Sequence, residues 1–395
     1  MVLVTGPAFA KLFRTLLPKS STKTQIRYIY AVCKEEPSKI LNDELLMNKL
    51  TYERAIEEKE IEIQTCGSLF QRWRKEKKYW TVPKGDINFK VKYIDTGYQN
   101  CDPKVSPLVL ALHGSPGSYN DFNSITSHLY DLGVRVVSPL FPDGKSLNAK
   151  VFRHTPEEKS EYVKDFLSAL NIPKIDLLIC HSSAVFPGQL LCLENNQITT
   201  NALCLLNPTS FENPRMMKPF SLMKFLIRLY EFPIGYQITK AAAKQLEKKT
   251  GLTKGTSGDN FFSAFTMVHS SIPQQRIHFE KLLKRNFPIM MVYSNNDKLI
   301  HPNDSLKMAK MMVHEEEIRR FDSAGKVTNV GGTNPFKKVL SFENGTHFVF
   351  KKQPEMTSKA VASFLFEHFD SHKQQCKHKS LSWEHIPHVP WQTEK

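Results

Sequence analysis

The chain contains no uninterrupted apolar run of about 18 residues, the length that a helix needs to cross a bilayer, so no membrane-spanning helix is expected. It also lacks a CxxC pair and any cluster of Cys and His at zinc spacing, so neither a metal nor a cofactor is expected. The cysteines are scattered and odd in number, which is typical of free thiols in a reducing compartment: Cys33, Cys66, Cys101, Cys180, Cys192, Cys204 and Cys376.

Acidic residues are absent from residues 1–34, where basic residues together with Ser and Thr interrupt the apolar stretches. This composition is typical of a mitochondrial transit peptide and also of a basic end of a cytoplasmic protein, so both locations stay open. Residues 35–82 are rich in Glu, Lys, Leu and Ile and predict a helical extension of one or two solvated helices outside the core. Residues 371–395, with Pro387 and Pro390, predict a disordered tail.

The balance of charge is strongly positive, with 54 Lys and Arg against 39 Asp and Glu, a net charge of +15. Such an excess favours contact with nucleic acid, anionic lipid or an anionic substrate. No nucleic-acid-binding motif accompanies the charge, so nucleic acid is not an expected partner. A length of 395 residues suits one domain with appendages.

Residues 83–370 alternate short apolar runs with amphipathic stretches, after a first alternating segment at 87–94. Continuous apolar strands separated by helices predict an α/β fold, a mostly parallel sheet covered by helices on both faces. In such sheets ligands bind at the carboxyl ends of the strands. The expected parallel strands are 108–112, 134–137, 175–180, 202–206, 289–293 and 338–342, and the expected helices include 157–170, 304–313 and 356–369.

A mostly helical insertion at residues 211–285 interrupts this alternation and predicts a cap. It contains 13 Lys and Arg against 5 Asp and Glu, so it carries more than half of the excess positive charge. Within it, residues 220–230 combine large apolar residues with Lys224 and Arg228. Either this helix packs its apolar side on the core with its basic side in water, or it makes peripheral contact with an anionic membrane or a lipid-like substrate.

Ser182 directly follows an expected strand and precedes a helical pattern, in the order Cys180-His181-Ser182-Ser183-Ala184. This is a relaxed form of the G-x-S-x-G nucleophile elbow, a strand-to-helix turn whose flanking positions need little or no side chain. Cys180 and Ala184 stand where glycines are usual, and both are small. The alternatives are a turn serine at 182 and, more remotely, Ser183 as the nucleophile.

With this elbow, residues 86–369 resemble the α/β-hydrolase superfamily. The segment His113-Gly114-Ser115-Pro116-Gly117 follows an expected strand and is similar to the HGxPG oxyanion loop of that family. Asp297 and His347 follow the strands after which the family places its acid and its catalytic histidine, and the chain order Ser, Asp, His is that of the family.

The resemblance implies that Ser182 is the nucleophile, His347 the general base and Asp297 the acid that orients the histidine. A histidine suits the role of base because an imidazole titrates near neutral pH. The main-chain NH groups of Ser115 and Ser183 would bind the oxyanion of the tetrahedral intermediate. The expected substrate-binding residues are His113, which also braces the oxyanion loop, Gly114 and His181.

The sequence therefore predicts a serine hydrolase that cleaves a small-molecule ester or thioester of an acyl or lipid-like kind through an acyl-enzyme. The alternative is a catalytically inactive hydrolase fold that binds a ligand, since both usual elbow glycines are missing. Epoxide hydrolases and haloalkane dehalogenases use an aspartate at the elbow, and Ser182 argues against both. Proline iminopeptidases share the HGxPG loop but need acidic groups in the cap, whereas this insertion is basic.

Overall fold

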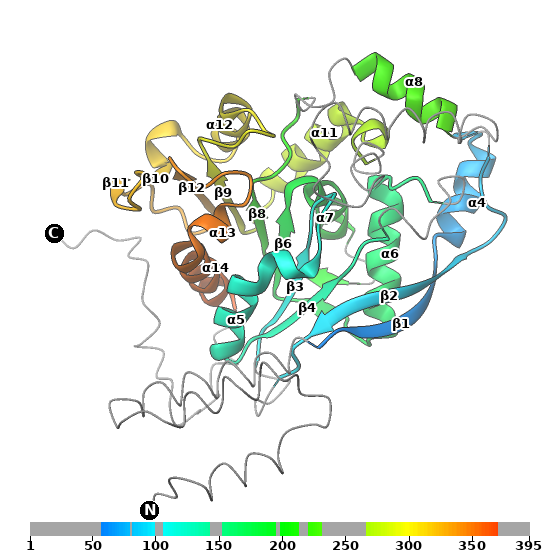
Figure 1. Cartoon of the computed structure of the whole chain (residues 1–395), viewed down its shortest axis with the longest axis horizontal. Helices are drawn as coiled ribbons and strands as arrows, with labels where there is room; N and C mark the ends of the chain where they lie inside the picture. Colours follow the sequence, from blue (N-terminus) through cyan, green and yellow to red (C-terminus); the bar gives the residue numbers. More distant parts are fainter. Residues whose placement is uncertain are drawn as a thin grey trace, which may run out of the picture. The chain divides into compact units, whose positions relative to one another are not determined.

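The computed structural model describes residues 57–79, 81–98, 106–142, 152–194, 198–212, 220–230 and 266–369. The predictions for residues 1–34, 35–56 and 371–395 lie outside the described residues. The centre of the fold is a ten-stranded sheet with the spatial order β1-β2-β4-β3-β6-β8-β9-β12-β10-β11 (Figure 1). The central strands run parallel, in the spatial order β4, β3, β6, β8, β9, β12 and β10. The remaining strands β1, β2 and β11 pair antiparallel at the two edges.

The apolar runs expected as parallel strands all lie in strands of the structure. Residues 108–112 form β3 without a shift at either end, and the other runs agree to within a few residues. The strands are β1 Lys59–Thr65, β2 Ile87–Asp95, β3 Leu108–Leu112, β4 Arg135–Pro139, β6 Leu177–His181, β8 Leu203–Leu206, β9 Ile289–Ser294, β10 Arg319–Phe321, β11 Val327–Asn329 and β12 Lys337–Phe342, with a separate pair β5 Lys174–Ile175 and β7 Thr199–Thr200.

Helices cover both faces of this sheet, as the continuous apolar strands predict. The α-helices in the described residues are α4 Gly67–Lys75, α5 Asn123–Asp131, α6 Pro156–Ala169, α7 Val185–Leu193, α8 Phe220–Tyr230, α11 Ile272–Leu283, α12 Pro302–Lys310, α13 Val349–Lys352 and α14 Pro354–His368. Along β3, Leu108, Leu110 and Leu112 join a core shared with α4, α6, α7, α11 and α12. Val109 and Ala111 join a second core shared with α5, α13 and α14.

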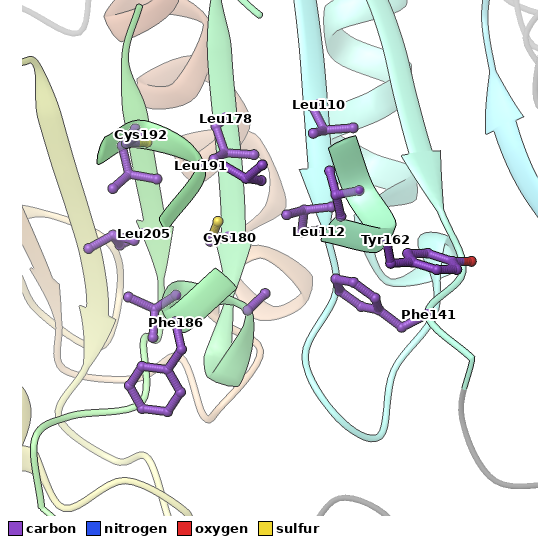
Figure 2. Packing of buried hydrophobic residues seen from close by; sticks show 14 of the residues in the cluster. Leu110, Leu112, Phe141, Tyr162, Leu178, Cys180, Phe186, Leu191, Cys192 and Leu205 are labelled. Carbon is purple, nitrogen blue, oxygen red and sulfur yellow. The ribbon is translucent and has the colours of Figure 1, made fainter. Parts of the chain in front are cut away.

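The first of these cores is packed from several elements at once. Figure 2 shows side chains from three neighbouring strands meeting those of the helices above them: Leu110, Leu112, Leu178, Cys180 and Leu205 from the sheet, with Tyr162, Phe186, Leu191 and Cys192 from α6 and α7. Because both faces of the central strands are buried, β3 and β8 consist only of apolar residues and Cys. The α/β prediction is confirmed.

Helix α6 shows how local sequence sets an element boundary next to the sheet. Thr155 accepts a hydrogen bond from the Glu158 NH at 3.0 Å, and the Glu158 carboxylate accepts from the Thr155 NH at 3.0 Å. This reciprocal capping box, with Pro156 at the first helical position, satisfies donors that would otherwise lack partners. The helix therefore begins at Pro156, two residues after the left-handed residue His154.

For the described residues between 57 and 82, the structure corrects the prediction of solvated helices outside the core. Residues 59–65 form β1, which pairs antiparallel with β2 along its whole length. The segment alternates apolar and charged residues with a period of two, so Ile63 is buried while Glu60 and Glu62 approach Lys90 at 3.9 and 3.7 Å. The high charge content suggested a helix, but the alternation is the stronger signal.

The following helix, α4, is likewise part of the fold and not an appendage. Leu69, Phe70 and Trp73 are buried in the first core, and the Trp73 ring lies 4.9 Å from that of Tyr79. The globular domain therefore begins upstream of residue 83, with β1 and α4 as structural members of it.

We expect Trp73→Ala to lower the free energy of unfolding by about 3–5 kcal/mol, because truncating a buried tryptophan removes apolar burial and leaves a cavity. The control Gln71→Ala lies on the exposed side of the same helix and is expected to have little effect. Urea unfolding followed by tryptophan-independent circular dichroism measures both. Equal stability of the two variants would place α4 outside the cooperative core.

Candidate active site

The predicted site residues lie at the carboxyl ends of the parallel strands. The strand order reverses near the middle of the sheet, between β3 and β6. β3 pairs with β4 on one side and β6 on the other, so the connections after β3 and β6 leave in opposite directions. In open parallel sheets this reversal opens a crevice at the carboxyl ends of the strands. His113 follows β3, Ser182 follows β6, Asp297 follows β9 and His347 follows β12, all at those ends.

Ser182 occupies a sharp turn between β6 and the short 3₁₀ segment Ser182–Ala184 that leads into α7. Its φ of 54° lies in the left-handed region, which L-residues rarely adopt. Gly114 lies directly against it, since a Cβ at position 114 would stand 2.8 Å from the Cβ of Ser182. The loop after β3 can approach the serine this closely only because residue 114 is glycine.

The structure explains how this elbow accommodates Cys180 in place of the usual glycine. The Cys180 side chain is fully buried and points at α7, where it meets Gly188. A Cβ on Gly188 would overlap the Sγ of Cys180, so the space that glycine usually provides in the strand is provided here by the helix. Ala184, at the other usual glycine position, is buried and small.

Ser182, His347 and Asp297 form a continuous line of hydrogen bonds. The Ser182 hydroxyl lies 2.9 Å from His347 Nε2, and His347 Nδ1 donates to Asp297 Oδ2 at 2.7 Å. Asp297 and His347 are buried, whereas Ser182 is half-buried. The imidazole thus has its unprotonated nitrogen directed at the hydroxyl and its protonated nitrogen directed at the carboxylate.

Asp297 is held as a carboxylate by its surroundings. Burial by itself raises its pKa, but the hydrogen bond from His347 and those from the NH groups of Leu299 (2.8 Å) and Ile300 (3.0 Å) outweigh burial, so its pKa lies below the ordinary value. The acid therefore remains charged at neutral pH and favours a positive charge on the adjacent imidazole.

Asn207 is a residue of the site that the sequence reasoning missed. It follows β8 and donates from Nδ2 to Asp297 Oδ2 at 3.1 Å and to the Thr346 carbonyl at 3.2 Å, while its Oδ1 accepts from the Val349 NH at 3.3 Å. It is buried and adopts a left-handed φ of 42°. The one signal in the sequence is a polar residue directly after a buried apolar strand, at the edge where ligands bind.

His113 and Gly114 hold the loop after β3 in place. The Phe141 NH donates to His113 Nε2 at 2.9 Å, so Nδ1 carries the hydrogen and donates to the Gly114 carbonyl at 2.6 Å. Both imidazole nitrogens therefore bond to main chain within a buried setting. This arrangement fits the bracing role of His113 and not a direct contact of its ring nitrogens with substrate.

His181 packs against the loop that carries His347. Its Nε2 donates to the main-chain carbonyl of His347 at 3.1 Å, and its ring centre lies 5.0 Å from that of His347 and 4.8 Å from that of Phe348. The side chain is 1% exposed, and its expected contact with substrate stays a prediction. Burial, together with the nearby His347, lowers the pKa of His181 to about 3 and keeps it neutral.

Ser115 and Ser183 flank the nucleophile position from the two loops. Ser183 directly follows Ser182 and is buried, and Ser115 follows Gly114, the residue in contact with Ser182. Their NH groups as an oxyanion hole stay a prediction. No group of three or more His, Cys, Asp or Glu among the described residues is placed to hold a metal ion.

Two further expectations concern the chain as a whole. Within the described ranges, no helix is long and apolar enough to span a bilayer. Four of the cysteines lie in these ranges, and each is a buried free thiol: Cys66, Cys180, Cys192 and Cys204.

The contact between Cys180 and Gly188 predicts that Gly188→Ala changes the free energy of unfolding in opposite directions with Cys180 and with alanine at position 180. Gly188→Ala alone is expected to destabilise by about 1–3 kcal/mol, because the added methyl overlaps a buried sulfur. With Cys180→Ala in place, the nearest strand atoms are Leu178 Cδ2 at 3.5 Å and the Cβ of residue 180 at 3.7 Å, both at ordinary contact distance, and alanine is then expected to stabilise the helix slightly. Thermal and urea unfolding of the four proteins measure the cycle, and additive effects would contradict the contact.

The neutral state of His181 predicts a pH-dependent stability. An imidazole with a folded pKa of about 3 against an unfolded value of 6.5 binds its proton preferentially in the unfolded chain, so stability falls as pH drops below 6.5. From about pH 7 to about pH 5.5 the wild type should lose roughly 1 kcal/mol more than His181→Phe, since other groups titrate alike in both. Parallel pH profiles from urea unfolding would show that His181 is charged in the fold.

A search of curated proteins found no match. Solved structures that match include a thermophilic esterase from Thermogutta terrifontis, with 13% identity, 79% of this chain and 100% of that chain covered, and a TM-score of 0.48. An esterase from Exiguobacterium antarcticum matches with 14% identity, coverage of 70% and 96%, and a TM-score of 0.46. An epoxide hydrolase from Vigna radiata matches with 13% identity, coverage of 80% and 99%, and a TM-score of 0.47.

The family comparison covers most of the chain. Residues 73–368 match the family described as "Alpha/beta hydrolase of unknown function (DUF1057)". The match begins in α4, ends in α14 and includes every residue of the site described above. The chain therefore belongs to this family of α/β hydrolases.

Proposed function

We propose that the protein is a serine hydrolase that cleaves an ester or thioester of an acyl or lipid-like small molecule through an acyl-enzyme on Ser182. The observation that carries the proposal is the hydrogen-bonded line from Ser182 Oγ through His347 to Asp297, at 2.9 and 2.7 Å, on an elbow with left-handed backbone at the serine. A hydroxyl, a base and an orienting acid at these distances are what acyl transfer needs.

In the first half of the reaction, His347 Nε2 takes the proton of Ser182 as Oγ attacks the carbonyl carbon of the substrate. The proton at Nδ1 stays in its bond to Asp297, whose negative charge stabilises the imidazolium. The NH groups of Ser183 and Ser115 bind the oxygen that becomes negative. When the tetrahedral intermediate collapses, the imidazolium gives its proton to the departing alcohol or thiol.

In the second half, water replaces the leaving group. His347 Nε2 takes a proton from that water, which attacks the acyl carbon, and the proton then returns to Ser182 Oγ as the acid departs. Asn207 acts as a positioning residue, since its amide holds the Asp297 carboxylate and the Thr346 carbonyl beside His347. The basic charge of residues 211–285 supports an acyl or anionic substrate over a substrate amine.

We expect Ser182→Ala to abolish hydrolysis of p-nitrophenyl esters, with a loss of several powers of ten and an unchanged fold. Ser183→Ala is the matched control, because the proposal uses only the NH of that residue. Hydrolysis is measured on esters of graded chain length, reactivity of the serine by fluorophosphonate labelling, and the fold by circular dichroism.

The outcomes separate the alternatives. Activity retained in a folded Ser182→Ala protein would move the nucleophile elsewhere. A folded wild type that neither hydrolyses any ester nor reacts with a fluorophosphonate would favour a catalytically inactive binding protein.

A further inference from the structure

The end of α4 concentrates positive charge at the surface. The seven residues from Arg72 to Lys78 include five basic residues and one acid, a net charge of +4. All five basic side chains are exposed, whereas Trp73 between them is buried. Lys78 pairs with Glu157 at 3.0 Å. The side chains of Arg72, Lys75 and Lys77 form no ion pair with any residue that the structure describes.

Helix α8 presents the same kind of surface with an aromatic ring added. Lys224, Phe225 and Arg228 are exposed, and Arg228 lies four residues after Lys224 and three after Phe225, so they share one side of the helix. Ile227 is buried in the first core, which fixes which side faces the protein. The helix contains no acidic residue. Phe225 is 60% exposed, more than any other large apolar side chain in the described residues.

The two surfaces belong to one region of the molecule. The Tyr79 ring lies 4.9 Å from that of Trp73 in α4 and 6.0 Å from that of His269. Burial and the charges of Arg153, Lys78 and Arg228 together lower the pKa of His269 to about 3, so Lys78 and Arg228 lie near one side chain. Figure 1 shows α4 and α8 at the same end of the view, away from β10 and β11.

A groove beside α4 adds a concave, basic element to this region. It has a volume of about 540 Å³ and is lined by Arg74, Lys77, Tyr79 and Val82. The Tyr79 ring carries the Arg153 guanidinium at 4.5 Å and Lys78 Nζ at 5.6 Å. A groove lined by two cationic side chains and a tyrosine suits a phosphate-bearing headgroup.

We propose that Arg72, Lys75, Lys77, Lys224, Phe225 and Arg228, here termed the basic face, form a docking surface for a bilayer that contains anionic phospholipid. The unpaired cations attract the negative surface, Phe225 enters the headgroup region, and the groove receives a headgroup phosphate. The exposed ring separates this surface from a duplex-DNA backbone site, where cations bind the phosphates without an apolar anchor. The ring also distinguishes this surface from a helix side that is only solvated, where polar residues are expected.

The test uses the full chain with Ser182→Ala, so that no lipid is hydrolysed during the measurement. We expect co-sedimentation with vesicles of phosphatidylcholine mixed with phosphatidylserine, little with phosphatidylcholine alone, and a loss of binding at high salt because ions screen the attraction. Equal binding to both vesicles, or to neither, would overturn the proposal. Failure here leaves ester hydrolysis by the wild type unaffected, so this proposal and the catalytic one fail separately.

Charge reversals then locate the surface. Lys75→Glu with Lys224→Glu, one change on each helix, should weaken binding to the anionic vesicles more than tenfold, since each basic residue contributes about fivefold. Lys326→Glu with Lys352→Glu changes the net charge equally at exposed positions on β10–β11 and α13, and should retain binding. Equal losses in both pairs would mean that net charge alone acts.

The aromatic anchor has its own test. Phe225→Ser should weaken vesicle binding several-fold and leave the salt dependence unchanged, because it removes apolar contact and no charge. Binding of duplex DNA is the competing outcome. If Lys75→Glu and Lys224→Glu weaken DNA binding and the protein shows no preference among vesicles, the basic face is a nucleic-acid site and the proposal is overturned.

Discussion

The left-handed backbone at Ser182 is the constraint on which the site depends. A serine at φ 54° directs its hydroxyl out of the turn toward His347, but the conformation costs free energy for any residue with a Cβ. It persists because its neighbours leave no alternative: Gly114 lies against the serine Cβ, and the Thr209 NH donates to the Ser182 carbonyl at 3.1 Å. The two loops that meet at the crevice therefore fix each other.

Strain of this kind gathers at the same edge of the sheet. Asn207 and Thr346, which contact Asp297 and precede His347 respectively, are also non-glycine residues in the left-handed region, at φ 42° and 56°. Each is held by hydrogen bonds from the other loops, so the acid loop, the histidine loop and the end of β8 form one bonded unit. Two apolar cores beneath the site supply the rigidity that such a unit needs.

The sequence contains most of this fold, and the exceptions have physical causes. Buried parallel strands must be apolar on both faces, so runs such as 108–112 are visible without any structure. The segment 59–65 was misjudged because charged residues on an edge strand resemble those of a solvated helix until their alternation is noticed. The small size of Cys180 is visible in the sequence, but the place of its sulfur is not, since that space comes from Gly188, eight residues later in a helix. Asn207 was missed for a similar reason, because its role arises only from contacts with residues 90 and 139 positions away.

The placement of charge in the site follows from what the proposed reaction must do. His347 has to become positive while its ring centre lies 5.0 Å from that of His181, and two imidazolium ions at that separation in a buried setting would repel each other strongly. Burial keeps His181 neutral, and its Nε2 donates to the His347 carbonyl, which only a protonated nitrogen can do. Asp297 is held negative by donors from its own loop and from Asn207. The site thus contains a fixed negative charge and a fixed neutral imidazole next to His347, the residue proposed to take the proton of the serine.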